Sequence, residues 1–271
     1  MIRMSSHQPH TTLLRRRRTK IVATIGPVSR DPAMLETLIR AGVNVFRLNL
    51  SHGDHEEHRV NFERVRAAAS ALGEPVAILA DLCGPKIRVG RLVGGRLLLE
   101  TGQQVTVTTR NVLGEPGLIP SQYPALAQDV RPGDHILLDD GMLELRVVSV
   151  AGTEILCTVT AGGVLKDRKG MNLPGVMVSS PSLTDKDRED AHFALDLGVD
   201  YLALSFVRRP RDVADLKELI ASTGANTPVI AKIEKPEALD AIDEILEAAD
   251  GLMVARGDLG VELAPEAVPI V

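Results

Sequence analysis

Residues 229–239, VIAKIEKPEAL, place a lysine and a glutamate at the end of an otherwise apolar run. Successive side chains of a β-strand point to opposite faces, so Lys232 and Glu234 lie on the same face. Such a neighbouring ammonium and carboxylate can form a structural ion pair. They can also bind an anion together with a metal ion. The ends of the other apolar runs bear on this choice.

Polar residues also end the other apolar runs that we predict as strands. These residues are Thr24, Arg47, Asn49, Ser51, Asp81, Ser205, Arg208, Arg256 and Asp258. The active site of a parallel α/β barrel lies at the carboxyl ends of its strands. We therefore expect these side chains to lie on one rim with Lys232 and Glu234. A structural ion pair explains Lys232 and Glu234, but it does not explain the polar ends of the other strands.

The residue types on this rim suit a phosphorylated substrate and a metal ion. Asp81, Glu234 and Asp258 offer hard oxygen ligands, which suit Mg²⁺ bound jointly by protein and phosphate oxygens. Arg47, Arg88 and Lys232 offer cations for a multiply charged anion, and arginine can bind phosphate through two hydrogen bonds. The sequence therefore predicts a site for a metal ion and a phosphate-bearing ligand.

Other sequence motifs give weaker indications of a binding site. His52, His55 and His58 accompany two glutamates, but their spacing spreads them around a helix, and HEEH is one residue short of the zinc motif H-E-x-x-H. A solvated helix start is favoured over a zinc site, with His52 bordering the rim. The chain contains neither G-x-x-x-x-G-K-[ST] nor G-x-G-x-x-G, so nucleotide phosphates would not be held by a P-loop or a Rossmann turn.

Strands and helices alternate on both sides of a different central segment. Predicted strands cover residues 20–26, 43–51, 75–82, 200–207, 228–234 and 251–257, and predicted helices cover residues 31–42, 54–73, 182–198, 210–223 and 236–249. The first helix has Asp31 as a possible cap, Pro32 in its first turn and Gly42 at its end. This alternation predicts a parallel sheet or barrel.

The central segment reads as strands only. Runs 103–109, 135–140, 143–150 and 153–160 alternate apolar and polar residues, with glycine turns between them. We predict an α/β fold, a TIM-type (β/α) barrel interrupted by a small all-β domain. The predicted parts are a barrel segment 19–84, an inserted β-barrel domain 85–180 and a second barrel segment 181–271. Six barrel strands are predicted, whereas a closed barrel has eight, so the barrel is expected to be incomplete.

Charge is uneven along the chain. The formal net charge is −5, and residues 1–20 contain six arginines and lysines and no acid, so the remainder carries −5 − 6 = −11. We predict residues 1–18 to be a disordered basic tail rather than an organelle-targeting segment or a nucleic-acid-binding arm. The sequence contains no run of 18 apolar residues, which is about the length needed to span a membrane. Cys83 and Cys157 share no metal or redox spacing, which favours a reduced, cytoplasmic protein.

Several segments together resemble the pyruvate kinase family. They are TKIVATIGP, NVFRLNLSHG, DLCGPKIRVG, LLDDGMLELRV, KGMNLPG, LALSFVR, KIEKPEAL and DEILEAADGLMVARGDLGVELAPE, in family order from residue 19 to the end. The resemblance implies phosphoryl transfer from phosphoenolpyruvate to ADP, giving pyruvate and ATP. It also implies a (β/α) barrel with a β cap after its third strand, acting as a lid that excludes water.

The resemblance also assigns residues. It implies that Arg47 holds the substrate phosphoryl group and that Lys232 stabilises the enolate at the transferring phosphoryl. Glu234 and Asp258 would bind Mg²⁺ or Mn²⁺, and Gly257 would contact substrate beside Asp258. The nucleotide and phosphate region would be lined by Asn49, Ser51, His52, Arg88 and Lys169.

The sequence departs from the family pattern in two places, and each departure leads to a prediction. Many members bind a monovalent cation, here corresponding to Asn49, Ser51, Asp81 and the carbonyl at Leu82. This chain reads DLCGPKIR where those members read DTKGPEIR, so Lys86 would supply the positive charge and K⁺ would not be required. The second departure is that the family's TQMLE-like segment, last two barrel strands and C-terminal domain do not appear before Val271.

From this second departure we expect a fragment or truncated product with low activity and a tendency to associate. The family is homo-oligomeric, with a homotetramer expected for a full-length chain. Expected partners are phosphoenolpyruvate and ADP or ATP, without nucleic acid or membrane. Two alternatives stay open: a non-catalytic paralogue that binds a full-length subunit, and a metal-dependent pyruvate/phosphoenolpyruvate-barrel aldolase or lyase.

Overall fold

The computed structural model describes residues 17–264 and 266–271. The chain divides into two compact units, and each is described by itself. The first contains the described residues up to 82 with 189–203 and 220–228, and the second contains residues 83–188, 204–219 and 229–271. Most of the predicted basic tail, residues 1–16, lies outside the described residues. Arg17 donates hydrogen bonds to the carbonyl of Gly42 at 2.5 Å and to Oδ1 of Asn44 at 2.7 Å.

Six parallel strands outside the inserted segment confirm the predicted α/β architecture. They are β1 (Val22–Thr24), β2 (Val45–Asn49), β3 (Ala77–Asp81), β12 (Tyr201–Leu204), β13 (Val229–Ile233) and β14 (Gly251–Val254). In the first unit the order is β1-β2-β3-β12, and in the second β13 pairs with β14. Because every pair is parallel, the carboxyl ends of paired strands lie at the same edge.

The helices follow the strands as a barrel pattern requires. They are α2 (Pro32–Arg40), α3 (His55–Leu72), α5 (Asp185–Leu197), α6 (Pro210–Ser222), α7 (Pro236–Asp240), α8 (Ile242–Ala248) and α9 (Arg256–Glu262), with the 3₁₀ turn η2 at Val268–Ile270. The prediction of one helix over 236–249 was wrong, since Ala241 adopts φ −112° and ψ 24° and separates α7 from α8. The prediction of a strand up to residue 257 was also wrong, because α9 begins at Arg256.

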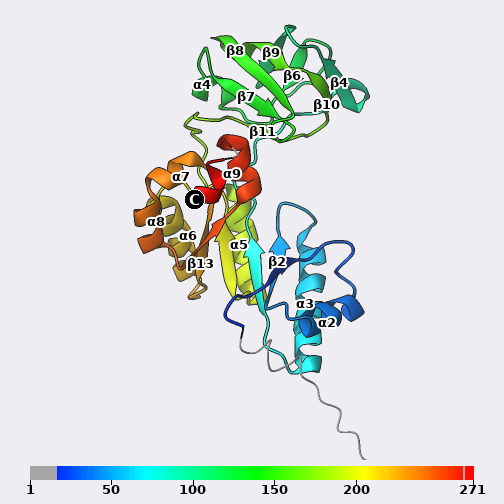
Figure 1. Ribbon diagram of the computed structural model, residues 1–271, viewed down its shortest axis with the longest axis vertical. Helices are drawn as coiled ribbons and strands as arrows, with labels where there is room; N and C mark the ends of the chain where they lie inside the picture. Colours follow the sequence, from blue (N-terminus) through cyan, green and yellow to red (C-terminus); the bar gives the residue numbers. More distant parts are fainter. Residues whose placement is uncertain (1–16, 265) are drawn as a thin grey trace, which may run out of the picture. The chain divides into compact units, whose positions relative to one another are not determined.

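Side-chain caps fix the helices of the first unit. The Asp31 carboxylate accepts from the backbone N–H of Ala33 at 3.0 Å, with Pro32 at the first position of α2, as predicted. Asp54 accepts from the N–H of Glu57 at 2.8 Å and begins α3, which ends at Gly73 in the left-handed region with φ 62°. The two helices lie side by side (Figure 1). They hold the loops that follow β1 and β2.

The inserted segment is built from β-strands that pair antiparallel, except that β5 and β6 pair in parallel. These are β4 (Arg96–Leu99), β5 (Gln104–Thr108), β6 (Leu118–Pro120), β7 (His135–Leu138), β8 (Leu143–Ala151), β9 (Glu154–Ala161), β10 (Gly163–Lys166) and β11 (Met171–Asn172), with η1 (Val93–Gly95) and the short α4 (Leu126–Asp129). Six strands form a sheet in the order β11-β7-β8-β9-β5-β6, and β4 pairs with β10. The predicted all-β character is confirmed.

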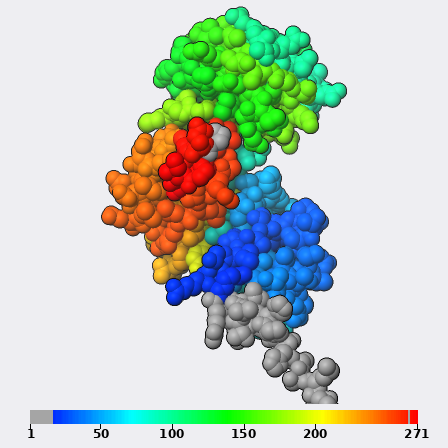
Figure 2. All heavy atoms as spheres, in the orientation of Figure 1, coloured from blue at the N-terminus to red at the C-terminus, as the bar shows by residue number. Residues whose placement is uncertain are grey.

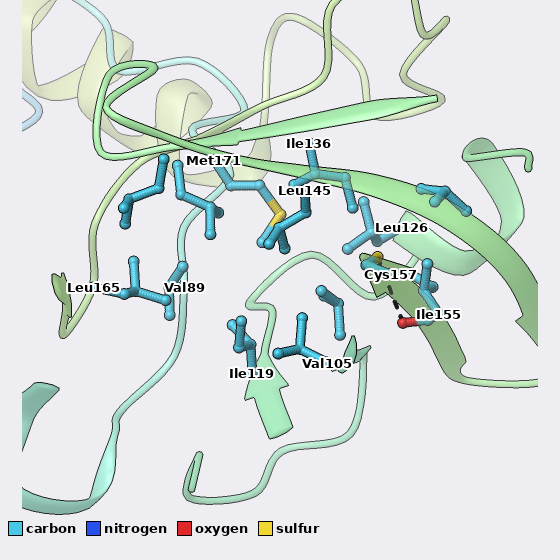
Figure 3. Close-up of a cluster of buried hydrophobic side chains, with 14 of the residues drawn as sticks. Val89, Val105, Ile119, Leu126, Ile136, Leu145, Ile155, Cys157, Leu165 and Met171 are labelled. Carbon is cyan, nitrogen blue, oxygen red and sulfur yellow. Dashed lines mark hydrogen bonds between the residues drawn. The ribbon is translucent and has the colours of Figure 1, made fainter. Parts of the chain in front are cut away.

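This segment has its own hydrophobic core. Alternate residues of β7, β8 and β9 point inward, and Ile136, Leu145, Ile155 and Cys157 are fully buried within it (Figure 3). The inward residues recur at every second position, which is the period of a strand with one buried face. The segment can therefore fold around its own apolar interior while its outer side chains face solvent.

Burial makes Cys157 an inert thiol. It raises the pKa of Cys157 to about 12, so the thiol stays protonated at pH 8. We expect a thiol reagent at pH 8 to modify at most Cys83 in the native chain and both cysteines after denaturation. Because the folded pKa is raised, the associated stability is present below the unfolded pKa and is lost as the pH rises toward 12. Mass spectrometry after alkylation checks this. Rapid native labelling of Cys157 would contradict it.

The far end of the chain lies at the surface, where residues 266–271 are coloured red in the space-filling view (Figure 2). Ile270 is 87% exposed there. Among the described residues, no helix has both the length and the apolar character needed to cross a bilayer.

Candidate active site

In the first unit, charged residues meet at the ends of β1, β2 and β3. The Arg47 guanidinium donates from Nε and Nη2 to Oδ2 of Asp81 at 2.6 and 2.5 Å, and from Nη1 to Oγ1 of Thr24 at 3.0 Å. The parallel register places Thr24 beside Arg47 and Asn49 beside Asp81. Asp81 is 1% exposed, whereas the Arg47 side chain is 25% exposed. The buried carboxylate therefore orients a guanidinium that reaches the surface.

The loop after β2 carries the predicted nucleotide contacts. Asn49 Oδ1 accepts from the backbone N–H of Ser51 at 3.2 Å, and the N–H of His52 donates to the Asn49 carbonyl at 3.3 Å. Nε2 of His58, which is buried, donates to the His52 carbonyl at 2.7 Å. His58 thus fixes the turn that presents His52.

The three histidines of this region have different surroundings. His55 contacts Oδ1 of Asp190 through Nε2 at 2.8 Å and stacks on Phe193 with ring centroids 4.1 Å apart. His58 instead contacts the His52 carbonyl. Among the described residues, no three His, Cys, Asp or Glu side chains are grouped so as to hold a metal ion by themselves.

In the second unit, the end of β13 holds a buried ion pair. Nζ of Lys232 lies 2.7 Å from Oε1 of Glu234 and donates to Oγ of Ser205 at 2.6 Å. The side chains of Lys232 and Glu234 are only 10% and 2% exposed. The other carboxylate oxygen, Oε2 of Glu234, accepts from the backbone N–H of Phe206 at 2.9 Å. Ser205 and Phe206, which follow β12, therefore hold the lysine and the glutamate in place.

Burial raises the pKa of Glu234 above its usual range, although the charge and hydrogen bond of Lys232 lower it. The Asp258 carboxylate also raises this pKa, so the two carboxylates act on each other electrostatically. A cation between them would relieve both the burial cost and the repulsion. Glu234 and Asp258 therefore fit a divalent cation by charge and by their hard oxygen donors.

Phe206 supports the Lys232–Glu234 pair in a way that the sequence did not reveal. Its φ of 56° lies in the left-handed region, which is unusual for a bulky side chain. Oγ of Ser182 donates to its carbonyl at 2.7 Å, and a Cβ added to Gly84 would lie 2.6 Å from its ring. This conformation directs the Phe206 N–H to Glu234. Residues 205–207 read simply as strand in the sequence, so no local signal could have revealed it.

A second buried ion pair lies beside the first. Nζ of Lys235 donates to Oε1 of Glu262 at 2.5 Å, and the same oxygen accepts from Nδ2 of Asn172 at 3.2 Å. These three residues join the start of α7, where Lys235 is the N-cap, to α9 and β11 within the second unit. A small cavity of about 50 Å³ is lined by residues that include Lys86, Asp140, Phe206, Arg208, Lys235 and Asp258. Lys86 and Asp258 therefore share one cavity.

The other predicted residues have partners of their own. Nη1 of Arg88 donates to the Arg168 carbonyl at 3.0 Å, and Nζ of Lys169 lies 2.8 Å from Oδ1 of Asp139. The hydrogen bond that Lys169 donates to Asp139 raises the pKa of Lys169, which therefore stays an ammonium. Arg208 donates to the Val178 and Ser180 carbonyls.

Two predicted residues remain to be placed. Gly257 lies in the first turn of α9 beside Asp258, and a Cβ added there would meet nothing within 4 Å. Leu82 is fully buried, and its N–H donates to the Ala203 carbonyl at 3.0 Å.

Parallel strands that alternate with helices, with a β segment inserted after the third strand, define a (β/α)-barrel class of protein. Residues 16–271 match the family described as pyruvate kinase, barrel domain. The chain belongs to the pyruvate kinase family, which confirms the resemblance seen in the sequence.

Individual relatives agree with this assignment. The chain is 52% identical over 258 residues to the pyruvate kinase of Staphylococcus saprophyticus, covering 94% of this chain and 44% of that protein. It is 49% identical over 255 residues to that of Mycobacterium tuberculosis H37Rv, covering 94% of this chain and 54% of that protein. A crystal structure of a pyruvate kinase from Cryptosporidium parvum matches with a TM-score of 0.90 and 39% identity, covering 96% of this chain and 55% of that one. The chain thus spans about half the length of the relatives it matches.

Proposed function

We propose that this chain transfers the phosphoryl group of phosphoenolpyruvate to ADP, giving pyruvate and ATP. The observation that carries the proposal is the buried Lys232–Glu234 pair, which Ser205 and the Phe206 N–H hold in place and on which Asp258 acts electrostatically. Family membership supports the same reaction. Phosphoryl transfer depends on positioning and charge neutralisation more than on covalent chemistry, and these groups supply both.

Each charged side chain has a distinct proposed role. Arg47, oriented by Asp81, binds the phosphoryl group of the substrate through its exposed edge. Lys232 neutralises negative charge on the transferring phosphoryl group and on the enolate oxygen, because its ammonium is held at the strand end in a water-poor setting. The surrounding hydrogen bonds keep the ammonium from reorienting during the reaction.

Glu234 and Asp258 are the proposed ligands of Mg²⁺ or Mn²⁺. When bound, the divalent ion supplies positive charge to phosphate and carboxylate oxygens of the substrate. The two carboxylates fit it because one is buried with a raised pKa and the other is exposed to the cavity that Lys86 also lines. Gly257 leaves room for the substrate beside Asp258.

The nucleotide is the proposed ligand of Asn49, Ser51, His52, Arg88 and Lys169. No glycine-rich phosphate loop is present in the sequence, so cationic side chains would bind its phosphates instead. The inserted β segment is the proposed lid that excludes water. A cytoplasmic location and a homotetramer of full-length chains stay predictions.

The test of the proposed function is ATP formation from phosphoenolpyruvate and ADP by the purified chain, with and without Mg²⁺. We expect slow, Mg²⁺-dependent turnover, together with calorimetrically measurable binding of phosphoenolpyruvate. Neither turnover nor binding in the presence of Mg²⁺ would contradict the proposal. Formation of an aldol product from pyruvate and an aldehyde would favour the aldolase alternative instead.

The second candidate is a non-catalytic chain that binds a full-length subunit. This candidate stays a prediction from the sequence. Mixing the chain with an intact relative and measuring the mass of the product by light scattering distinguishes the two candidates. Stable mixed complexes without turnover would support the second.

A further expectation concerns monovalent cations. Because Lys86 places an ammonium in the cavity shared with Asp258, we expect replacing Na⁺ by K⁺ to leave the rate unchanged. Lys86→Glu should slow the Na⁺ reaction and make K⁺ stimulate it about tenfold, a difference of about 1.4 kcal/mol in the barrier. Initial rates in matched NaCl and KCl check this. Clear K⁺ stimulation of the unmodified chain would contradict it.

A further inference from the structure

The inserted β segment contains a second, larger hollow that the proposed reaction does not use. We call it the arginine groove; it has a volume of about 660 Å³, and the residues lining it include Arg91, Arg110, Asn111, Gln122 and Arg168. This volume lies in the range of small-ligand sites. None of the residues that line it is acidic, and it shares no residue with the cavity of the candidate active site.

Arg110 is held in a defined orientation from behind. Its Nε donates to Oε1 of Glu154 at 2.8 Å and to Oγ1 of Thr108 at 3.3 Å, and the Thr108 hydroxyl in turn donates to the same glutamate oxygen at 2.8 Å. The hydrogen bond from Arg110 lowers the pKa of Glu154, which keeps this carboxylate ionised. Since the contacts use Nε, the two terminal nitrogens of Arg110 remain for a ligand.

Arg91 and Arg168 are positioned through their backbones. The Gly114 N–H donates to the Arg91 carbonyl at 2.8 Å, while the Arg168 N–H donates to the Gly90 carbonyl at 3.3 Å. Arg168 adopts a φ of 57°, and its carbonyl accepts from Arg88. Within the described part of the chain, neither of these two guanidinium groups takes part in an ion pair. Neither positive charge is therefore paired with a carboxylate at ion-pair distance.

The base of the groove is closely packed. A Cβ added to Gly114 would lie 2.5 Å from Cδ of Pro120, and one added to Gly90 would lie 3.0 Å from Cγ of the same proline. Pro120 itself ends β6 and is buried. The segments that carry Arg91 and Arg110 thus converge on a tightly packed proline, which limits how far they can move apart.

The charges of the groove define the class of its ligand. Three guanidinium groups line it and one is balanced by Glu154, which leaves a charge of about +2. Planar guanidinium groups match phosphate oxygens bidentately, and polar side chains such as Asn111 and Gln122 can add hydrogen bonds. We propose that the arginine groove binds a small phosphate-bearing anion, separately from the proposed reaction. The simpler alternative is that these arginines are solvated surface residues. A phosphate site would lose phosphate binding when the arginines are substituted, whereas solvated arginines would show no saturable binding to lose.

The test is titration of the whole chain with inorganic phosphate by isothermal calorimetry, without divalent metal and at constant ionic strength. We expect saturable binding of one phosphate that weakens at least tenfold in Arg110→Gln/Arg168→Gln. Glu154→Gln, which removes the support behind Arg110, should weaken it less. Arg146→Gln is the matched control, since Arg146 is an exposed arginine of β8 outside the groove, and it should bind phosphate normally. Calorimetric melting of each variant confirms that it is folded.

Several outcomes would overturn the proposal. They are no saturable phosphate binding, equal weakening in Arg146→Gln, and loss of binding in Lys232→Met with retention in the double arginine variant. That last result would place the phosphate at the proposed reaction site instead. Binding of a duplex oligonucleotide through Arg110 and Arg168 without binding of free phosphate would also count against a small-molecule site. Phosphate binding that survives Lys232→Met would stand even if the chain formed no ATP.

Discussion

Lys232→Met is expected to lower ATP formation from phosphoenolpyruvate and ADP at least about a thousandfold, the effect of removing a fixed charge from a preorganised site. The ammonium lies 2.7 Å from Glu234 and 2.6 Å from Ser205, so solvent cannot readily replace it. Methionine is an unbranched side chain one atom shorter than lysine, so the substitution removes the ammonium with its charge and hydrogen bonds and keeps most of the apolar stem. Initial rates at saturating Mg²⁺ and both substrates measure the effect.

The same substitution should also destabilise the fold, which must be separated from the effect on catalysis. Removing the ammonium leaves the Glu234 carboxylate buried without its charge partner, which costs about 3–5 kcal/mol in the free energy of unfolding. Lys232→Met/Glu234→Gln should recover most of that stability, because both charges are then absent, but none of the activity. Urea denaturation followed by circular dichroism gives the stabilities. A single variant that is as active as the unmodified chain would remove Lys232 from the mechanism.

The sequence predicted the parts of the site that depend on strand period alone. Lys232 and Glu234 share a face because they are two residues apart, and the ion pair at 2.7 Å follows directly from that. The polar ends of β1, β2 and β3 likewise follow from parallel pairing, which places Thr24 beside Arg47. These features follow from the strand period and from the parallel pairing expected of alternating strands and helices, so the sequence was enough to infer them.

Other features could not be read in this way because they depend on contacts between distant segments. The left-handed conformation of Phe206 results from packing against Gly84 and from hydrogen bonds with Ser182 and Glu234. The Lys235–Glu262 pair joins residues 27 positions apart, which no strand or helix period relates. Nothing in residues 236–249 marks the break at Ala241 strongly, since alanine is itself a good helix former. Tertiary structure decides these features.

Asp258→Asn is expected to remove most of the stabilisation that Mg²⁺ gives to the chain. A ligand that binds only the folded state stabilises it in proportion to ln(1 + [L]/Kd), which is about 2.7 kcal/mol at a hundredfold excess over Kd. Asp258 acts electrostatically on Glu234, and an amide supplies neither the charge nor the same affinity for Mg²⁺. Because Asp258 is exposed, the substitution should leave the metal-free fold intact. Calorimetric melting at 0 and about 10 mM Mg²⁺ measures the lost stabilisation, because about this concentration is needed to fill a weak two-carboxylate site.

Asp243→Asn is the matched control, because Asp243 is an exposed aspartate at the start of α8 and has no proposed role in metal binding. It should keep the full Mg²⁺ response, whereas Asp258→Asn should keep less than about half of it and should lose at least about a hundredfold in ATP formation. This readout of stability does not depend on turnover, so it tests the metal site even if the chain is inactive. If Asp258→Asn and Asp243→Asn respond to Mg²⁺ alike, the ion binds elsewhere, and Lys232 and Glu234 then form only a structural ion pair.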